Sequence, residues 1–359
     1  MPVDYKDIIS ANIEDRKGLF LETSNRLNTT IQNIEKDFWV CWVLRLLFND
    51  SSISIDKRLL FKGGTSLSKS YGLISRFSED IDITVFRDDL GQSYDIDFLE
   101  GLGTKQRNKR LTSIKETCQV YINGDFKKEL ESAINAMLES SGLPLDTVTV
   151  SQDENDPDGQ TLLVNYPTVL DQIDEYHLPS VKIEAGAKSA CDPNHPTQIK
   201  PYIADDIPDD DLTVLNITTI KAERTFWDKV IILHGQRCFY ENKGDLKRNG
   251  HRVSRHYYDV YRLLENNVGG VSSEHIALAQ NCARHTRMFF NSKDSNLESA
   301  LPGSFRLSPL PEMEAILKKD YDAMAGMIFG DIPDWNDIVS KIKEFEQKIN
   351  SVEIIKTKK

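Results

Sequence analysis

The stretch FKGGTSLSKSYGLISRFSEDIDITVF, residues 61–86, constrains the fold more than any other part of the chain. A turn of small residues follows a short apolar run, a helix is expected after it, and residues 80–86 then alternate as in a β-strand. Asp80 and Asp82 stand two apart on that strand, so their side chains point to the same face, roughly 6 to 7 Å apart along it. The segment therefore predicts a strand, turn, helix and strand that present two carboxylates together.

Two carboxylates on one face raise each other's pKa unless a cation lies between them. Mg²⁺, or Mn²⁺ in its place, prefers such oxygen ligands. The turn upstream, KGGTS at 62–66, offers backbone N–H groups and hydroxyls that can hold a phosphate. Its order differs from the GxxxxGK[ST] loop, and the chain has no GxSxG or HExxH motif. These features predict metal-dependent chemistry on a nucleoside triphosphate.

The net charge of −12 argues against a protein that coats nucleic acid through a generally basic surface. A local basic patch could still hold a nucleic-acid substrate, although a solvated helix face or loop explains such residues equally well. Two stretches qualify: Lys105, Arg107, Lys109, Arg110 and Lys115, and then Lys243, Lys247, Arg248, Arg252 and Arg255.

The remaining composition points to a cytoplasmic protein without a membrane partner. No apolar run reaches the ~18 residues that cross a bilayer, and the N-terminus has no signal pattern. The five cysteines are scattered and form no CxxC or disulfide pattern, so we expect free thiols.

The pattern along the chain predicts an α/β N-terminal part and a helical C-terminal part, which is an α+β fold class. Expected strands are 59–61, 80–86, 147–150, 161–166 and 179–187. Expected helices of the first part are 31–48, 66–73 and 104–140. The acidic loop ADDIPDDD, 204–211, is expected to separate a domain of residues 1–212 from a helical domain of residues 213–359. The helices expected there are 221–233, 256–264, 274–290, 310–327 and 335–349.

Glu184 lies in PSVKIEAGA, where the apolar residues share one face of a predicted strand and Lys182 and Glu184 share the other. A third carboxylate on a neighbouring strand would complete, with Asp80 and Asp82, a site for one or two metal ions. Glu184 could equally form a surface ion pair with Lys182.

Lys229 and Asp259 are candidates in the helical part. In KAERTFWDKVIILH, Lys229 falls at the edge of an apolar stripe, where its ammonium could reach a triphosphate in a cleft or simply reach solvent. In SRHYYDVYRLL, Asp259 lies four residues after Arg255, so the two could pair on a helix. His256 is not expected to be catalytic, because phosphoryl chemistry needs positioning and charge more than an imidazole base.

Five separated segments resemble, in the same order, those of the AbiEii/AbiGii-type abortive-infection toxins, which are bacterial nucleotidyltransferases of the DNA polymerase β superfamily. They are IEKDFWVCWVLRLLF, KGGTSLSKSYGLISRFSEDIDI, PSVKIEAGA, VLNITTIKAERTFWDKVIILH and SRHYYDVYRL, and they span most of the chain. The resemblance implies a polymerase β-like nucleotidyltransferase domain with a mixed sheet, N-terminal helices and a helical insertion around 87–145, followed by a helical domain.

The resemblance also implies a role for each candidate residue. The nucleotide-binding residues would be Lys62, Gly63, Gly64, Thr65, Ser66 and Lys229. The catalytic residues would be Asp80, Asp82, Glu184, Lys229 and Asp259, of which the first three would bind Mg²⁺.

The implied function is the transfer of a nucleotide from an NTP to an acceptor, in some relatives the 3′ end of tRNA, by the toxin of a toxin–antitoxin pair. Such toxins act in abortive infection, a defence against phage, and are typically encoded with a cognate antitoxin. Ser78 stands where some relatives carry a hydroxyl that their antitoxin phosphorylates. Two alternatives stay open: transfer to a protein side chain, and binding of nucleotide or RNA without chemistry.

Overall fold

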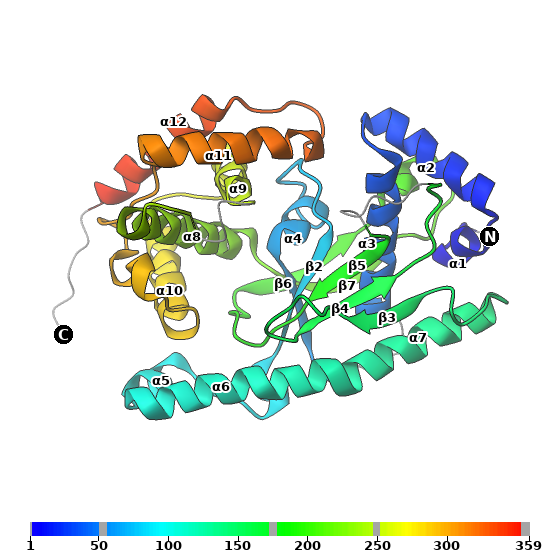
Figure 1. Cartoon of the computed structure of the whole chain (residues 1–359), viewed down its shortest axis with the longest axis horizontal. Helices are drawn as coiled ribbons and strands as arrows, with labels where there is room; N and C mark the ends of the chain where they lie inside the picture. The colour runs from blue at the N-terminus through cyan, green and yellow to red at the C-terminus, as the bar shows by residue number, and fades with distance from the viewer. Residues whose placement is uncertain (1, 50–55, 172–177, 247–251, 353–359) are drawn as a thin grey trace. The chain divides into compact units, whose positions relative to one another are not determined.

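The computed structural model describes residues 2–49, 56–171, 178–246 and 252–352. Within them the chain forms two compact units, whose elements are labelled in Figure 1. The first unit comprises Met1–Gly72, Phe77–Asp95 and Leu102–Ile220, and the second comprises Leu73–Arg76, Ile96–Gly101 and Lys221–Lys359.

One mixed sheet forms the centre of the first unit, with the strand order β3-β4-β5-β2-β1-β7-β6. Its strands are β1 (Leu59–Lys62), β2 (Asp80–Val85), β3 (Thr149–Gln152), β4 (Thr161–Asn165), β5 (Ser180–Glu184), β6 (Asn194–Ile199) and β7 (Val214–Ile220). β2 runs antiparallel to β1 and parallel to β5, so it is a central strand. The strand that carries both aspartates is therefore fixed by hydrogen bonds on both sides.

The two faces of the sheet differ because side chains alternate along each strand. Ile81 and Ile83 of β2 and Val181 and Ile183 of β5 are fully buried on one face. The neighbouring positions, which point to the other face, carry the polar residues of the strand. This alternation is the pattern expected from the sequence.

Helices contribute the rest of the first unit: α1 (Tyr5–Ser10), α2 (Ile13–Leu27), α3 (Ile31–Asn49), α4 (Gly63–Lys69), α6 (Thr104–Tyr121) and α7 (Lys127–Ser140). α3 is buried along most of its length and contacts β2, β5 and β7. A π-helical turn (Ile122–Phe126) joins α6 to α7, and Figure 1 shows the three as one long helical stretch. The expected helical region 104–140 is confirmed, and the basic residues Lys105 to Lys115 lie on α6.

The second unit is helical, with α5 (Ile96–Gly101), α8 (Ala222–Lys243), α9 (Ser254–Glu265), α10 (Ser273–Phe289), α11 (Pro311–Met324) and α12 (Trp335–Asn350). α8 contacts α9 and α10, and α9 contacts α11 and α12. Aromatic packing of Phe226 and Trp227 against Phe345 helps to form its core. All five helices expected after residue 220 are confirmed.

β6 and β7 were not expected, and residues 214–220, which the sequence analysis assigned to the helical domain, form β7. β7 pairs with β1 and β6 because its β-branched residues, such as Val214, Ile217 and Thr219, suit a pleated sheet. The first unit accordingly extends to Ile220, and the acidic loop 204–211 lies within it rather than at its end. α4 also differs in detail from expectation, since it begins inside the glycine turn and ends at Lys69.

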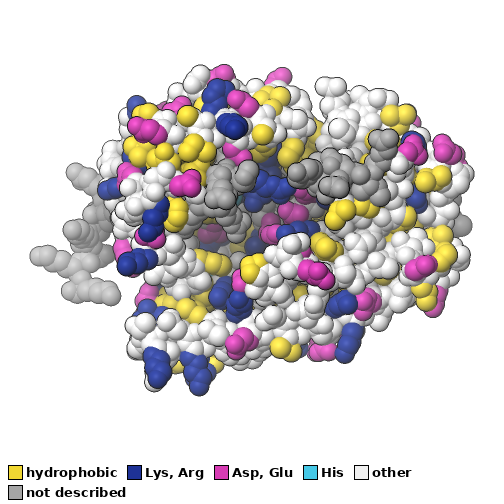
Figure 2. Space-filling model, viewed as in Figure 1, with side chains coloured by type: hydrophobic (Ala, Val, Ile, Leu, Met, Phe, Trp, Pro, Cys, Tyr) yellow, Lys and Arg dark blue, Asp and Glu magenta, His cyan; other side chains and the backbone are white. Residues whose placement is uncertain are grey.

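The α+β class, with a mixed sheet followed by helices, is confirmed. Basic and acidic side chains are interspersed over the face of the molecule seen in Figure 2. Among the described residues, no helix is both long enough and apolar enough to cross a membrane.

Candidate functional site

The sheet brings the three predicted metal-binding carboxylates together on one face. Asp80 and Asp82 lie on β2, and the parallel register with β5 places Lys182 opposite Asp80 and Glu184 opposite Asp82. Residues directly opposite each other on paired strands point to the same side of a sheet. The strand pairing supplies what the sequence could only suggest, which is that Glu184 belongs beside the aspartates.

The carboxylates perturb one another. Burial raises the pKa of Asp80 to about 6, and the negative charges of Glu79, Glu184 and Asp82 contribute in the same direction. The positive charge of Lys182 opposes this shift but does not cancel it. A bound cation would relieve this repulsion.

Two lysines contact these carboxylates in the structure. Lys182 Nζ lies 3.0 Å from Glu184 Oε1 and 3.4 Å from Asp153 Oδ2, and Lys62 Nζ lies 3.6 Å from Asp82 Oδ1. The ion pair of Lys182 with Glu184, which the sequence left open, is therefore present.

The three carboxylates suit a metal ion because they supply oxygen ligands, but they do not form a complete coordination site as they stand. Within the described ranges, no three His, Cys, Asp or Glu side chains are arranged to hold an ion as they stand. The oxygen donors, their common face and the raised pKa of Asp80 all suit a divalent cation. Binding one would require Asp82 and Glu184 to exchange their lysine contacts for the ion.

Gly63 lets the carboxylate of Asp82 lie directly against the turn. Its φ is +81°, and a Cβ built on it would stand 1.8 Å from Asp82 Oδ2. Only a residue without a side chain permits this approach, since the backbone conformation is also one that L-residues rarely adopt. The glycine turn and the aspartate strand therefore form one local structure.

The hydroxyls of the turn bind the protein itself. Thr65 and Ser66 are fully buried. Thr65 Oγ1 donates to the carbonyl of Asp80 at 2.5 Å and is hydrogen-bonded with Ser78 Oγ at 2.9 Å, while Ser66 Oγ donates to the carbonyl of Gly63 at 2.9 Å. These hydroxyls fix the turn against β2, so they are already engaged within the protein.

A buried ion pair anchors the other end of α4, and sequence reasoning did not identify it. Lys69 Nζ lies 2.7 Å from Asp37 Oδ1 on α3 and 3.7 Å from the ring centre of Tyr202. Asp37 Oδ2 also accepts a hydrogen bond of 2.7 Å from the backbone N–H of Tyr202. A charged residue inside the apolar stretch IEKDFWVCW was the one signal that could have revealed it.

In the second unit, Lys229 of α8 and Asp259 of α9 form an ion pair, with 2.8 Å between Nζ and Oδ2. Arg76 also donates to Asp259, from Nε to Oδ1 and from Nη2 to Oδ2, both at 2.7 Å. Asp259 is fully buried, and Arg76 and Lys229 are nearly so. The sequence suggested Arg255 as the partner of Asp259, whereas the structure shows Arg76 and Lys229 in that role.

Electrostatics in this cluster are dominated by the two cations. Burial alone would raise the pKa of Asp259, but Arg76 and Lys229 hold it far below its usual value. Burial lowers the pKa of Lys229, Asp259 raises it, and Arg76 lowers it again. The carboxylate of Asp259 is therefore ionised.

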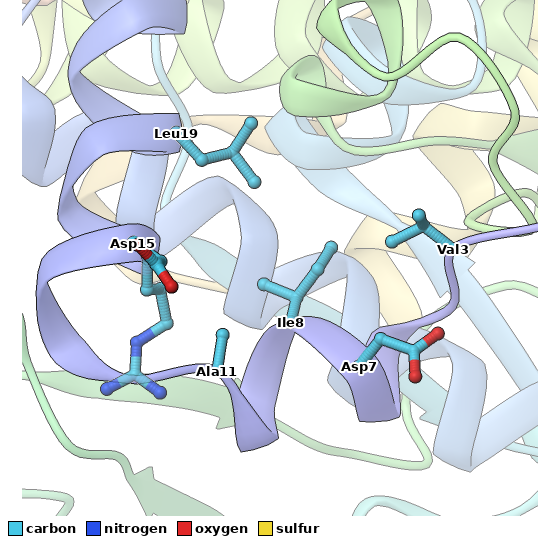
Figure 3. A pocket seen from close by; sticks show the side chains of 7 residues that line it. Val3, Asp7, Ile8, Ala11, Asp15 and Leu19 are labelled. Carbon is cyan, nitrogen blue, oxygen red and sulfur yellow. The ribbon is translucent and has the colours of Figure 1, made fainter.

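The remaining candidates are placed as follows. The turn 62–66, Asp80, Asp82 and Glu184 belong to the first unit, and Lys229 and Asp259 belong to the second. The second basic stretch includes residues 247 and 248, which lie outside the described residues. A pocket shown in Figure 3 is unrelated to these candidates, since it is lined by Val3, Asp7, Ile8, Ala11, Asp15, Arg16 and Leu19 of the N-terminal region.

Comparison with known proteins gives a family and similarities to solved structures. A family model described as "Nucleotidyl transferase AbiEii toxin, Type IV TA system" matches residues 45–351, a range that includes every candidate residue. The structure is also similar to that of MenT4, a nucleotidyltransferase toxin from Mycobacterium tuberculosis H37Rv. That similarity has a TM-score of 0.41 and 14% sequence identity, and it covers 93% of this chain and 96% of that chain. No curated protein sequence matches this chain.

Proposed function

The chain belongs to the AbiEii family of nucleotidyltransferase toxins of type IV toxin–antitoxin systems, and from this premise we propose that it transfers NMP from an NTP to an RNA acceptor such as the 3′ end of tRNA, in a Mg²⁺-dependent reaction. In this proposal the transfer arrests the host during phage infection, and a cognate antitoxin restrains it. The main support for metal dependence in this proposal is the set of three carboxylates on one face of β2 and β5.

Asp80 and Asp82 are the proposed holders of the divalent ion, with Glu184 as a third ligand. When bound, such an ion supplies charge stabilisation for the phosphoryl oxygens. Asp80 already lies in an environment that favours a nearby cation, because burial and neighbouring carboxylates raise its pKa. Lys62 contacts Asp82, and Lys182 contacts Glu184. These two lysines offset part of the negative charge of the carboxylates.

The other residues bind and orient the substrate. Backbone N–H groups of the turn from Gly63 to Ser66 are proposed to hold nucleotide phosphates, and Lys229 to offset the charge of the leaving pyrophosphate. The acceptor hydroxyl attacks the α-phosphorus, a new P–O bond forms, and the bond to pyrophosphate breaks as the hydroxyl proton passes to solvent or a carboxylate. Such phosphoryl chemistry depends mainly on positioning and charge, so no dedicated base is required.

The test compares the native protein with Asp80→Asn, using each labelled NTP, Mg²⁺ and total RNA. Asp89→Asn is the matched control, since Asp89 lies beyond the C-terminal end of β2 and pairs with Arg58, with 2.8 Å between Nη2 and Oδ1. We expect labelled RNA from the native protein and from Asp89→Asn, and a loss of at least a hundredfold with Asp80→Asn. Label in protein instead would establish the side-chain acceptor. Nucleotide binding without any labelled product would contradict transfer.

A further inference from the structure

The N-terminal half of α6 is a basic stretch in an acidic chain. Residues 104–115 contain five lysines and arginines and no aspartate or glutamate, although the whole chain has a net charge of −12. Lys105, Lys109 and Arg110 are exposed. At 100° per residue, Lys105 and Lys109 lie about 40° apart around the helix, and the fully buried Ile114 lies about 180° from Lys105. The two lysines therefore face away from the body of the first unit.

The partners of these three cations set them apart from the other basic residues of the first unit. Most other lysines and arginines there form ion pairs, such as Lys36 with Glu79 at 2.8 Å. Within the described part of the chain, Lys105, Lys109 and Arg110 form no ion pair. Figure 2 shows basic side chains at the lower left, where Figure 1 places α6. This end of α6 therefore presents positive charge that no carboxylate of the described chain balances.

Helix stability does not explain this arrangement. Lys105 and Lys109 stand four residues apart, and like charges at that spacing destabilise a helix slightly. Arg110 Nη1 donates to the hydroxyl of Tyr94 at 2.8 Å, and its guanidinium lies 5.0 Å from the centre of the Tyr94 ring. These contacts orient Arg110 without neutralising it. The stretch is better explained by a ligand that carries negative charge.

A strand of RNA is the polyanion that this surface fits best. One helical turn spans about 5.4 Å, which is comparable to the separation of successive phosphates along a strand. Gln106, Asn108 and Thr112 are also exposed, and their side chains can hydrogen-bond to phosphate and ribose oxygens. RNA is also the polyanion that the proposed reaction requires as its acceptor.

One loop connects α6 with the carboxylates of the first unit. Lys115 of α6 pairs with Asp158 in the loop between β3 and β4. At the start of the same loop, Asp153 Oδ2 lies 3.4 Å from Lys182 Nζ, which in turn contacts Glu184. The exposed cations lie within about 15 Å of Lys115 along the helix axis. An RNA strand on α6 would therefore be held beside the part of the unit that contains the proposed metal ligands.

We propose that Lys105, Lys109 and Arg110 form a surface on α6 that binds the phosphate backbone of the acceptor RNA. The choice of RNA rests on the proposed nucleotidyl transfer to RNA. The surface raises the affinity for the acceptor without contacting the reacting atoms. Because phosphate contacts carry no sequence information, it does not select a base sequence.

Fluorescence anisotropy with fluorescein-labelled tRNA, in EDTA and without NTP, measures binding without turnover. Lys105→Met/Lys109→Met should weaken binding roughly tenfold or more near 0.1 M salt. It should also reduce the slope of log K against log salt concentration by about 1.4 to 1.8, because two phosphate contacts are lost. Lys127→Met/Lys128→Met is the matched control on α7, where Lys127 pairs with Glu131 at 3.4 Å. This control removes the same charge and should leave the slope unchanged.

A charge-retaining variant separates lost charge from lost structure. Lys105→Arg/Lys109→Arg should bind tRNA within about threefold of the native protein, and circular dichroism establishes that each variant is folded. The proposal is overturned if the native protein binds no tRNA, if the methionine variant keeps the native slope, or if the arginine variant binds as weakly as the methionine variant. Polyglutamate that displaces labelled tRNA as well as unlabelled tRNA of equal charge would indicate an acidic protein partner instead, and would also overturn it.

The surface and the transfer reaction fail in different ways. If both proposals hold, the methionine variant raises the KM for RNA and leaves kcat unchanged, since the surface lies outside the chemistry. If only the surface is wrong, label enters RNA with the native KM in this variant. If only transfer to RNA is wrong, no label enters RNA, while the difference in anisotropy between the variants persists.

Discussion

Gly63 has no side chain, and the carboxylate of Asp82 fills the space where one would be. Gly63→Ala should therefore abolish transfer, because the new methyl group must displace a proposed metal ligand. Gly72→Ala is the matched control: its φ is +62°, so the backbone strain is similar, about 1–2 kcal/mol, but nothing lies within 4 Å of the new Cβ. Thermal unfolding should show similar destabilisation of both variants, with activity lost only in Gly63→Ala. Equal activity of the two would contradict the role of this contact.

Lys182 holds Glu184 by an ion pair of 3.0 Å, so it competes with any divalent ion for that carboxylate. We expect Lys182→Met to lower the Mg²⁺ concentration that gives half-maximal transfer. Lys115→Met is the control, since Lys115 pairs with Asp158 at a similar side-chain exposure, 33% against 34%. The measurement is a Mg²⁺ titration of the transfer rate. A higher Mg²⁺ requirement in Lys182→Met would show that the lysine assists the metal site rather than competing with it.

For single residues, the sequence predicted which side chains lie together on one strand better than which side chains of distant segments make contact. Asp80 and Asp82 share a face because alternation is a local property of a strand. Arg76 was missed because its partner Asp259 lies 183 residues away, and no spacing rule connects them. The i to i+4 spacing on a helix favoured Arg255 instead, whereas the structure pairs Asp259 with Arg76 and Lys229.

The element that carries the glycine turn, α4, is fixed at its far end by Lys69 and Asp37. Lys69→Met leaves the buried carboxylate of Asp37 without a cation, which should cost about 3–5 kcal/mol in free energy of unfolding. The double variant Lys69→Met/Asp37→Asn removes both charges and should recover most of that loss, since the oxygen of the introduced amide can still accept from the N–H of Tyr202. Urea unfolding measures both. A double variant as unstable as Lys69→Met would show that lost packing, and not the unpaired charge, causes the effect.

Among the elements, the helices were the more predictable part. The C-terminal helices have strong periodicity and ordinary ends, so 256–264 and 335–349 were found nearly as they are. β7 was missed because it follows an acidic loop and because β1, one of the two strands it pairs with, comes from a distant part of the chain. Strand order in a mixed sheet depends on such long-range pairing, which one sequence does not display.

For the molecule as a whole, the net charge of −12 limits how an RNA acceptor could be bound. A protein with this charge repels RNA in general, so an RNA substrate must be held by local contacts. On the face seen in Figure 2, basic side chains are interspersed with acidic ones. Recognition of a limited part of an RNA, such as a 3′ end, is consistent with that distribution.

We propose that the NMP part of an NTP, which contains the α-phosphorus, is transferred to RNA. The direct measurement uses one NTP in two forms, labelled at the α-phosphorus and labelled at the γ-phosphorus, each with the native protein, Mg²⁺ and RNA. Transfer of NMP predicts that only the α-label enters RNA, while the γ-label leaves in pyrophosphate. Entry of the γ-label, or of neither label, would contradict the account.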